Sequence, residues 1–240
     1  MNRHARHHAL SQIGDAGQQR IAGASVLLIG VGGIGCAAAS YLASSGVGHI
    51  VLNDFDTVDE TNLGRQVLFG PGDIGESKAQ VAAARLLAIN PDIRVTVIDE
   101  RLDSAAMAKA IREVDVVLDG CDNFATRFLV NDVCVAGQCC LVSGSAIRLE
   151  GQMAVFGPDY QTSPCYRCLY EDADESLENC AGNGVLAPVP GVIGTLMAVE
   201  ALKFLAGLDA PRGRLLLYDA GDSSVRAIEI SKRSDCPACS

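Results

Sequence analysis

A glycine-rich run from Gly30 to Gly35 constrains the fold of this 240-residue chain more than any other feature. It follows a short apolar run at residues 25–29 and precedes an alanine-rich stretch at 34–44, the pattern of a buried strand, a tight turn and a helix. This order brings backbone N–H groups and the positive end of a helix dipole against a phosphate. The four glycines have no Cβ to keep the phosphate away; they are Gly30, Gly32, Gly33 and Gly35. We therefore predict a nucleotide site, with ATP and NAD as the alternative ligands.

An acidic residue stands where such a site binds ribose. Asp54 directly follows a second apolar run, residues 49–53, and lies about 20 residues beyond the glycines. A carboxylate at the end of the second strand can accept hydrogen bonds from both ribose hydroxyls, in ATP as in NAD. Asp56 is a weaker candidate for cofactor binding, because a turn or helix-cap role explains it better.

Further polar residues favour ATP over NAD. They are Asn62, Arg65, Gln66 and Lys78. Arg65 offers a planar fork of donors suited to phosphate, and Lys78 opens a predicted helix and adds a point charge. Either cation alone would be an ordinary solvated charge. Their order after Asp54 indicates a nucleotide whose phosphates take part in the reaction.

Asp122 and Asn123 follow another apolar run, residues 114–118. Ligands of open α/β sheets bind beyond the carboxyl ends of the strands. A carboxylate there can hold Mg²⁺, which takes one or two protein carboxylates together with phosphate oxygens. The alternative is that this pair only caps the next helix.

Helix and strand patterns alternate along most of the chain. Besides those named, helices are predicted around 11–21 and at 78–89, 104–111, 128–136 and 192–206, and strands at 94–98, 140–142 and 153–156. Residues 214–218 and 225–230 read as an antiparallel hairpin. The fold class is therefore α/β, a Rossmann-like, mostly parallel sheet flanked by helices with a C-terminal antiparallel extension. We interpret residues 1–240 as a single domain, with an arm (1–23), a nucleotide-binding core (24–157), a long loop (158–190) and a C-terminal part (191–240).

Two Cys-x-x-Cys pairs predict a structural zinc site. The ligands would be Cys165, Cys168, Cys236 and Cys239. Each pair supplies two thiolates, and two pairs complete a tetrahedral site with no open position for catalysis. The zinc would join the end of the chain to the long loop. A redox dithiol is the rival interpretation, but it does not need two pairs.

The other cysteines differ in their surroundings. Cys180 stands alone in the long loop, where it is either a nucleophile or a bystander thiol. Four more fall in helix or strand patterns and are interpreted as small buried hydrophobes; they are Cys36, Cys134, Cys139 and Cys140.

Composition excludes several classes of partner. The formal net charge of −10 argues against broad binding to nucleic acid or anionic membranes. The N-terminus lacks an apolar signal segment, and the most apolar stretch, residues 191–208, carries Glu200 and Lys203 and reads as a buried helix. We expect a cytoplasmic protein with no membrane partner.

Taken together, these motifs resemble the ThiF/MoeB family of ubiquitin-activating-enzyme-like adenylyltransferases. The resemblance rests on Arg3-His4-Ala5-Arg6, Gly30 to Gly35, Asp54-Phe55-Asp56, Asn62-x-x-Arg65-Gln66, Lys78, Asp122 to Arg127, the zinc cysteines, Gly184 to Pro188 and Gly191 to Gly194. It implies that Asp54 binds ribose, that Arg65 and Lys78 contact ATP phosphates, and that Asp122 holds Mg²⁺. It also implies a homodimer in which Arg6 reaches into the neighbouring subunit's site. In some members a cysteine at the position of Cys180 forms a covalent link to the carrier.

The activity implied by the resemblance is ATP-dependent adenylation of a small ubiquitin-like sulfur carrier, ThiS- or MoaD-like, at its C-terminal Gly-Gly. Pyrophosphate is released, and a persulfide from a separate donor then forms a thiocarboxylate for thiamine or molybdenum cofactor biosynthesis. The chain reads Gly120-Cys121 where the family commonly has Cys-Thr, a change that should be tolerated. A nicotinamide-dependent oxidoreductase and an inactive carrier-binding module are the alternatives.

Overall fold

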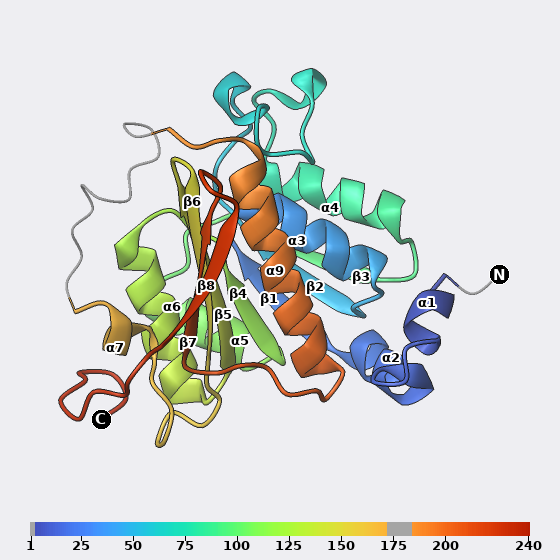
Figure 1. Ribbon diagram of the computed structural model, residues 1–240. Coiled ribbons are helices and arrows are strands. Elements are labelled where there is room, and N and C mark those ends of the chain that lie inside the picture. The colour runs from blue at the N-terminus through green and yellow to red at the C-terminus, as the bar shows by residue number, and fades with distance from the viewer. Residues whose placement is uncertain (1–2, 172–183) are drawn as a thin grey trace.

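The computed structural model describes residues 3–171 and 184–240, and one eight-stranded sheet runs through them (Figure 1). The strand order is β3-β2-β1-β4-β5-β6-β7-β8. The strands are β1 (Ser25–Ile29), β2 (His49–Asn53), β3 (Arg94–Ile98), β4 (Val116–Asp119), β5 (Cys140–Ile147), β6 (Glu150–Phe156), β7 (Arg214–Asp219) and β8 (Ser224–Glu229). Pairing is parallel from β3 to β5 and antiparallel from β5 to β8. The predicted fold class is confirmed.

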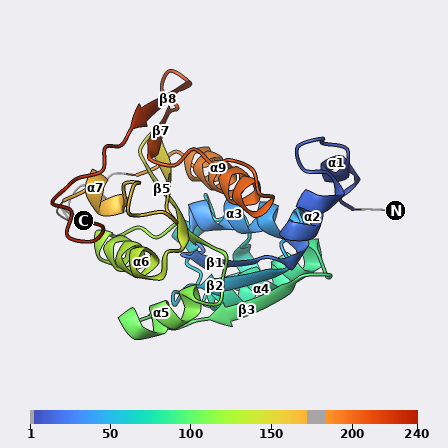
Figure 2. The same cartoon turned by 90° about the horizontal axis from the view of Figure 1, so that it is seen from below.

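Helices cover both faces of the sheet (Figure 2). The described helices are α1 (Ala5–His8), α2 (Gly14–Gly23), α3 (Gly33–Ser44), α4 (Lys78–Ile89), α5 (Ser104–Ile111), α6 (Phe124–Gly137), α7 (Tyr166–Leu169) and α9 (Pro188–Leu205), with short 3₁₀ turns η1 (Glu60–Asn62) and η2 (Pro71–Asp73). Buried residues of α3, α4 and α9 form one apolar core, and those of α5, α6 and α7 form the other. Strands β1, β2 and β4 lie between these cores and are buried on both faces, which explains their continuous apolar runs. The edge strand β3 is only partly buried.

Helix α9 is the one helix of residues 3–171 and 184–240 that is long and apolar enough to cross a membrane by length and composition. Its Ile193, Met197 and Ala201 are nevertheless fully buried against the core. This is the pattern of a core helix, as predicted. The helix begins earlier than predicted, because Pro188 and Pro190 fit its first turn.

Other boundaries also differ from the prediction. Helix α6 begins at Phe124 and not at 128, because the Asn123 side chain accepts a hydrogen bond from the Thr126 N–H at 2.9 Å and caps it. The helix predicted around 11–21 corresponds to α2, which begins and ends slightly later, and the short helix α1 before it was not predicted. Strands β5 and β6 extend well beyond the predicted 140–142 and 153–156 and meet in a tight turn at residues 148–149.

Candidate functional site

The glycine loop connects β1 to α3 as predicted, and its glycines serve different purposes. Gly30 has a φ of +83°, in the left-handed region that favours glycine. A Cβ on Gly35 would lie 2.0 Å from the Gly30 carbonyl oxygen, so helix and strand could not approach. A Cβ on Gly32 would meet nothing nearer than Gln66 Nε2, at 3.8 Å. Packing therefore does not require glycine at position 32, whereas a ligand lying against the backbone there would.

A cavity of about 390 Å³ opens at the carboxyl ends of the parallel strands. Its walls include Gly30, Gly32, Gly33, Asp54, Asp56, Asn62, Arg65, Gln66, Lys78, Asp122 and Asn123. The remaining wall is partly apolar, with Leu102, Met107 and Leu129. The glycines and cations on one part of the wall could bind phosphates, and the apolar residues on the other could contact a base. This combination suits a nucleotide. Of the predicted cofactor residues, Gly35 alone is not part of the wall, because it lies beneath the loop.

Asp54 holds the glycine loop as well as facing the cavity. Its Oδ2 accepts a hydrogen bond from the Val31 N–H at 2.7 Å, and its Oδ1 accepts one from the Asp56 N–H at 2.9 Å. Burial raises the pKa of this carboxyl, and the two backbone donors oppose that effect. Each carboxylate oxygen can accept a second hydrogen bond, so ribose hydroxyls could still bind.

Lys78 and Asp56 form an ion pair at the cavity wall. Lys78 Nζ lies 3.0 Å from Asp56 Oδ2, and the lysine side chain is only 8% exposed. Lys78 is also the first residue of α4, where the positive end of the helix dipole disfavours a cation. A bound phosphate would add negative charge beside Lys78 and the positive end of the α4 dipole.

The segment after β2 provides further groups. Arg65 donates to the Thr61 carbonyl at 3.0 Å, and the Asn62 side chain accepts from the Asp59 N–H at 3.2 Å. Gln66 is 3% exposed, and its Oε1 is buried without a hydrogen-bond partner within the described chain. A buried acceptor on a cavity wall fits a bound ligand that supplies the missing donor.

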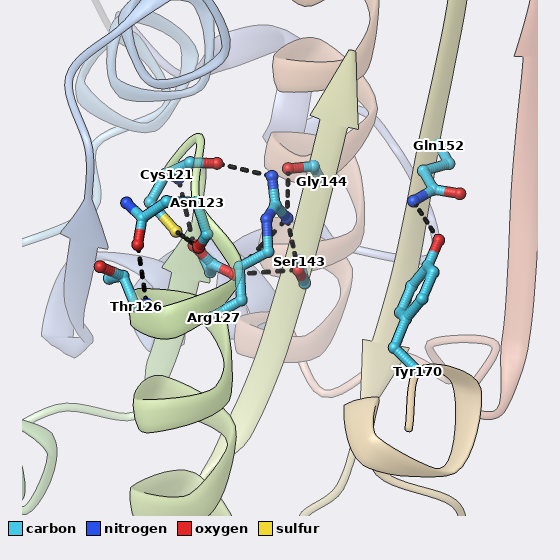
Figure 3. Close-up of polar contacts among 9 residues, drawn as sticks. Cys121, Asn123, Thr126, Arg127, Ser143, Gly144, Gln152 and Tyr170 are labelled. Carbon is cyan, nitrogen blue, oxygen red and sulfur yellow. Dashed lines mark hydrogen bonds and ion pairs between the residues drawn. The ribbon is translucent and has the colours of Figure 1, made fainter. Parts of the chain in front are cut away.

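Asp122 is exposed at the cavity edge, and Asn123 takes over the helix-capping role that was the alternative for this pair. The turn that carries Asp122 is held by a hydrogen-bond network around Arg127, which was not predicted from the sequence (Figure 3). Arg127 donates to the carbonyl oxygens of Cys121 at 2.5 Å and Gly144 at 3.1 Å. It also pairs with the buried carboxylate of Asp119 at 3.8 Å.

A second cavity, of about 310 Å³, adjoins the first. The two share Cys121 and Asp122 in their walls. The second follows the β5–β7 face of the sheet, and its further lining includes Arg127, Ser145, Glu150, Gln152, Tyr170 and Leu217. Asp122 therefore lies where two cavities meet.

The four predicted zinc cysteines come together although 71 residues separate the pairs. Their sulfur atoms all lie within 4.8 Å of one another, with Cys165 and Cys236 at 3.6 Å and Cys168 and Cys239 at 3.5 Å. Zinc–sulfur bonds of about 2.3 Å in a tetrahedron give sulfur separations of roughly 3.8 Å. The cluster fits a zinc ion.

Neighbouring groups support thiolates at this site. Lys232 Nζ lies 3.3 Å from Cys239 Sγ, and the Arg233 N–H donates to Cys168 Sγ at 3.5 Å. Such contacts stabilise negatively charged sulfur ligands. Away from the cluster, burial raises the pKa of Cys36 and Cys140 to about 12, which agrees with their interpretation as small buried hydrophobes.

A test of the zinc site is the variant Cys239→Ser. We expect about one zinc per wild-type chain, less in the variant, and a melting temperature lowered by roughly 10 °C, because a lost ligand weakens a tie between distant segments. Metal analysis and thermal unfolding measure both, with Ser234→Ala as the control. Wild-type protein that is fully stable without metal would contradict a structural zinc.

Two further predicted catalytic residues are Cys180 and Arg6. Cys180 lies outside the described residues. Arg6 belongs to α1, and the His4 ring of the same arm lies against Gly46, just beyond the end of α3. The glycine loop lies at the other end of α3, about 18 Å away for 12 residues of helix. Helix α1, which carries Arg6, therefore lies far from the start of α3 and from the cavity beside it; Figure 1 shows α1 beside α2, away from the sheet.

Comparisons with known proteins agree with this geometry. The ThiF family model matches residues 4–238. The chain is 44% identical to the sulfur carrier protein ThiS adenylyltransferase of Escherichia coli (strain K12), over 99% of this chain and 94% of that protein. It is 45% identical to the molybdopterin-synthase adenylyltransferase of the same organism, over 93% of this chain and 90% of that protein. A crystal structure of E. coli MccB with ATP is similar with a TM-score of 0.87 and 26% identity, over 100% of this chain and 74% of that one.

Proposed function

Because the chain belongs to the ThiF family, we propose that it is an adenylyltransferase that activates a small ubiquitin-like sulfur carrier with ATP. The acceptor is the C-terminal glycine of the carrier, and pyrophosphate is the other product. The adenylate prepares the carrier for thiocarboxylate formation with sulfur from a separate persulfide donor. One E. coli relative is named for the sulfur carrier protein ThiS and the other for molybdopterin synthase, so both thiamine and molybdenum cofactor biosynthesis fit.

The observation that carries this proposal is the meeting of two cavities at Cys121 and Asp122. The first has the glycine loop and cations for a nucleotide. The second runs along the β5–β7 face of the sheet, where an extended peptide tail could lie. A tail in the second cavity would bring its terminal carboxylate to the phosphates in the first, which a hydride-transfer enzyme would not need.

The chemistry requires positioning more than proton transfer. A terminal carboxylate has a pKa of about 3.5 and is already ionised at neutral pH, so no general base is needed. Its oxygen attacks the α-phosphorus of ATP, a new O–P bond forms, and the bond between the α-phosphorus and the bridging oxygen breaks as pyrophosphate leaves. The barrier is lowered by holding the two reactants together and by neutralising charge on the phosphates.

The chain's own residues divide this work. The glycine loop and the start of α3 hold the phosphates, Asp54 and the unpartnered Gln66 Oε1 face the ribose, and Arg65 and Lys78 neutralise phosphate charge. Asp122 is the carboxylate that would hold Mg²⁺, which supplies further positive charge when bound.

The enzyme is proposed to act as a homodimer in the cytoplasm. Arg6 is remote from its own cavity, so it can reach only that of a second subunit. Tyr41 on α3 and Val199 on α9 are 53% and 46% exposed on two helices that pack side by side, which supports a partner surface there. Cys180 is proposed as a site of covalent linkage to the carrier during sulfur transfer.

Isotope exchange between pyrophosphate and ATP tests the function. We expect exchange that requires Mg²⁺ and a carrier such as E. coli ThiS, and that stops when the last two glycines of the carrier are deleted. The reason is that the shortened tail still ends in a carboxylate but no longer reaches the α-phosphorus to form the mixed anhydride. Exchange that is independent of carrier, or none with either a ThiS or a MoaD-type carrier, would refute the proposal.

A further inference from the structure

Tyr170, in the wall of the second cavity, lies only two residues after the zinc ligand Cys168. Its hydroxyl accepts a hydrogen bond from Gln152 Nε2 at 2.5 Å (Figure 3). Gln152 belongs to β6 and lines the same cavity. One side of the cavity is therefore closed by contact between the sheet and the zinc-bound segment.

Aromatic packing fixes the ring of Tyr170. Its centroid lies 5.0 Å from that of Tyr166 and 5.6 Å, edge to face, from that of Phe124. Tyr166 in turn packs edge to face on Phe128 and Phe156, at 5.9 and 6.0 Å. Such pairs stabilise one another beyond their buried area. Phe124 is the first residue of α6, so this cluster also touches the element that follows Asp122.

The backbone around Tyr170 depends on the zinc cysteines. Helix α7 has only four residues, Tyr166–Leu169. The ligand Cys165 directly precedes the helix, and the ligand Cys168 lies within it. A helix of this length is not stable by itself in water. The Tyr170 N–H donates to the Tyr166 carbonyl at 3.1 Å, and the Tyr166 N–H donates to Asn131 Oδ1 at 2.8 Å. Release of the cysteines would therefore loosen the support of Tyr170.

We propose that Tyr170 is a positioning residue for the C-terminal tail of the carrier, and that the zinc centre acts on carrier recognition by holding this residue in place. The inference rests on the function proposed above. A Gly-Gly tail has no side chains to fill pockets, so it is bound through peptide groups and by packing against flat surfaces. An aromatic ring with a polar edge, beside the Gln152 amide, offers both. The nucleotide cavity does not include Tyr170, so its effect should fall on the carrier.

Two substitutions separate this role from a general structural one. Tyr170→Ala removes ring and hydroxyl, and we expect the KM for the E. coli ThiS carrier in pyrophosphate exchange to rise about tenfold. The KM for ATP should change less than about twofold, with zinc content unchanged. Tyr170→Phe keeps the ring and should recover most of the carrier affinity. Tyr218→Ala is the matched control, because this tyrosine packs against the other core of the sheet.

Zinc depletion tests the second half of the proposal. Wild-type protein partly depleted by a chelator should lose affinity for ThiS, measured by calorimetry, while an ATP analogue binds with a Kd within about twofold of the zinc-loaded protein. Equal loss of both affinities would show that zinc only maintains the whole fold, and would overturn this half. If the wild type is active and the KM for the carrier is unchanged in Tyr170→Ala, the inference about Tyr170 is overturned but the proposed function is not. Wild type without carrier-dependent exchange would overturn the proposed function as well.

Discussion

Replacing Asp122 with alanine is expected to lower carrier-dependent pyrophosphate exchange by at least about 10²-fold. Asp122 is exposed at the point where the two cavities meet. Its neighbours have structural tasks: Asn123 caps α6, and Asp119 is buried against Arg127. Asp122 is thus the carboxylate of this turn that is available to a metal–phosphate complex. Exchange rates over a range of Mg²⁺ concentrations measure the loss.

Stability should not follow activity in this variant. Within the described residues the Asp122 side chain supports no element, so the melting temperature of Asp122→Ala should stay within a few degrees of wild type. Asp209→Ala, an exposed acid beyond the end of α9, serves as the control and should retain full exchange. A wild-type rate in Asp122→Ala would mean that another group holds the cation.

The sequence predicted the parallel half of the sheet well because its central strands β1, β2 and β4 are buried on both faces. The bounds of β1, β2 and β3 agree with the predicted runs, and α4 stops where Asn90 and Pro91 follow. The extensions of β5 and β6 were missed for a physical reason. There the sheet faces the second cavity, so Ser145, Glu150 and Gln152 replace apolar residues and erase the pattern.

The sequence predicted those residues of the candidate site that directly follow the ends of strands. The carboxyl ends of parallel strands meet at one edge, so the glycine loop, Asp54 and Asp122 had to lie together. The pair formed by Arg127 and Asp119 was not assigned, because pairing between a helix and a neighbouring strand depends on tertiary packing. A signal existed: Arg127 interrupts the apolar face of α6 next to Phe124 and Phe128. A cation at such a position needs a buried partner.

The position of Arg6 leads to the second large prediction. The arm that carries it packs at the far end of α3 from the glycine loop, so a contribution to catalysis has to come from another subunit. We expect Arg6→Ala to lower exchange by about 10²-fold, since one phosphate-neutralising charge is lost. Its cavity should stay intact, and the Kd for an ATP analogue should change far less than the exchange rate.

Complementation between two inactive variants tests whether this arginine acts across the dimer. A heterodimer of one Arg6→Ala subunit and one Asp122→Ala subunit, purified through two different affinity tags, contains one site with its own Asp122 and the partner subunit's arginine. Such a dimer should recover about half the wild-type exchange rate, because one of its two symmetric sites is complete. If Arg6 acted within its own chain, each site would lack one group and the heterodimer would be as inactive as either parent. Dimers in which both subunits carry Asp122→Ala, purified through the same two affinity tags, provide the baseline exchange rate.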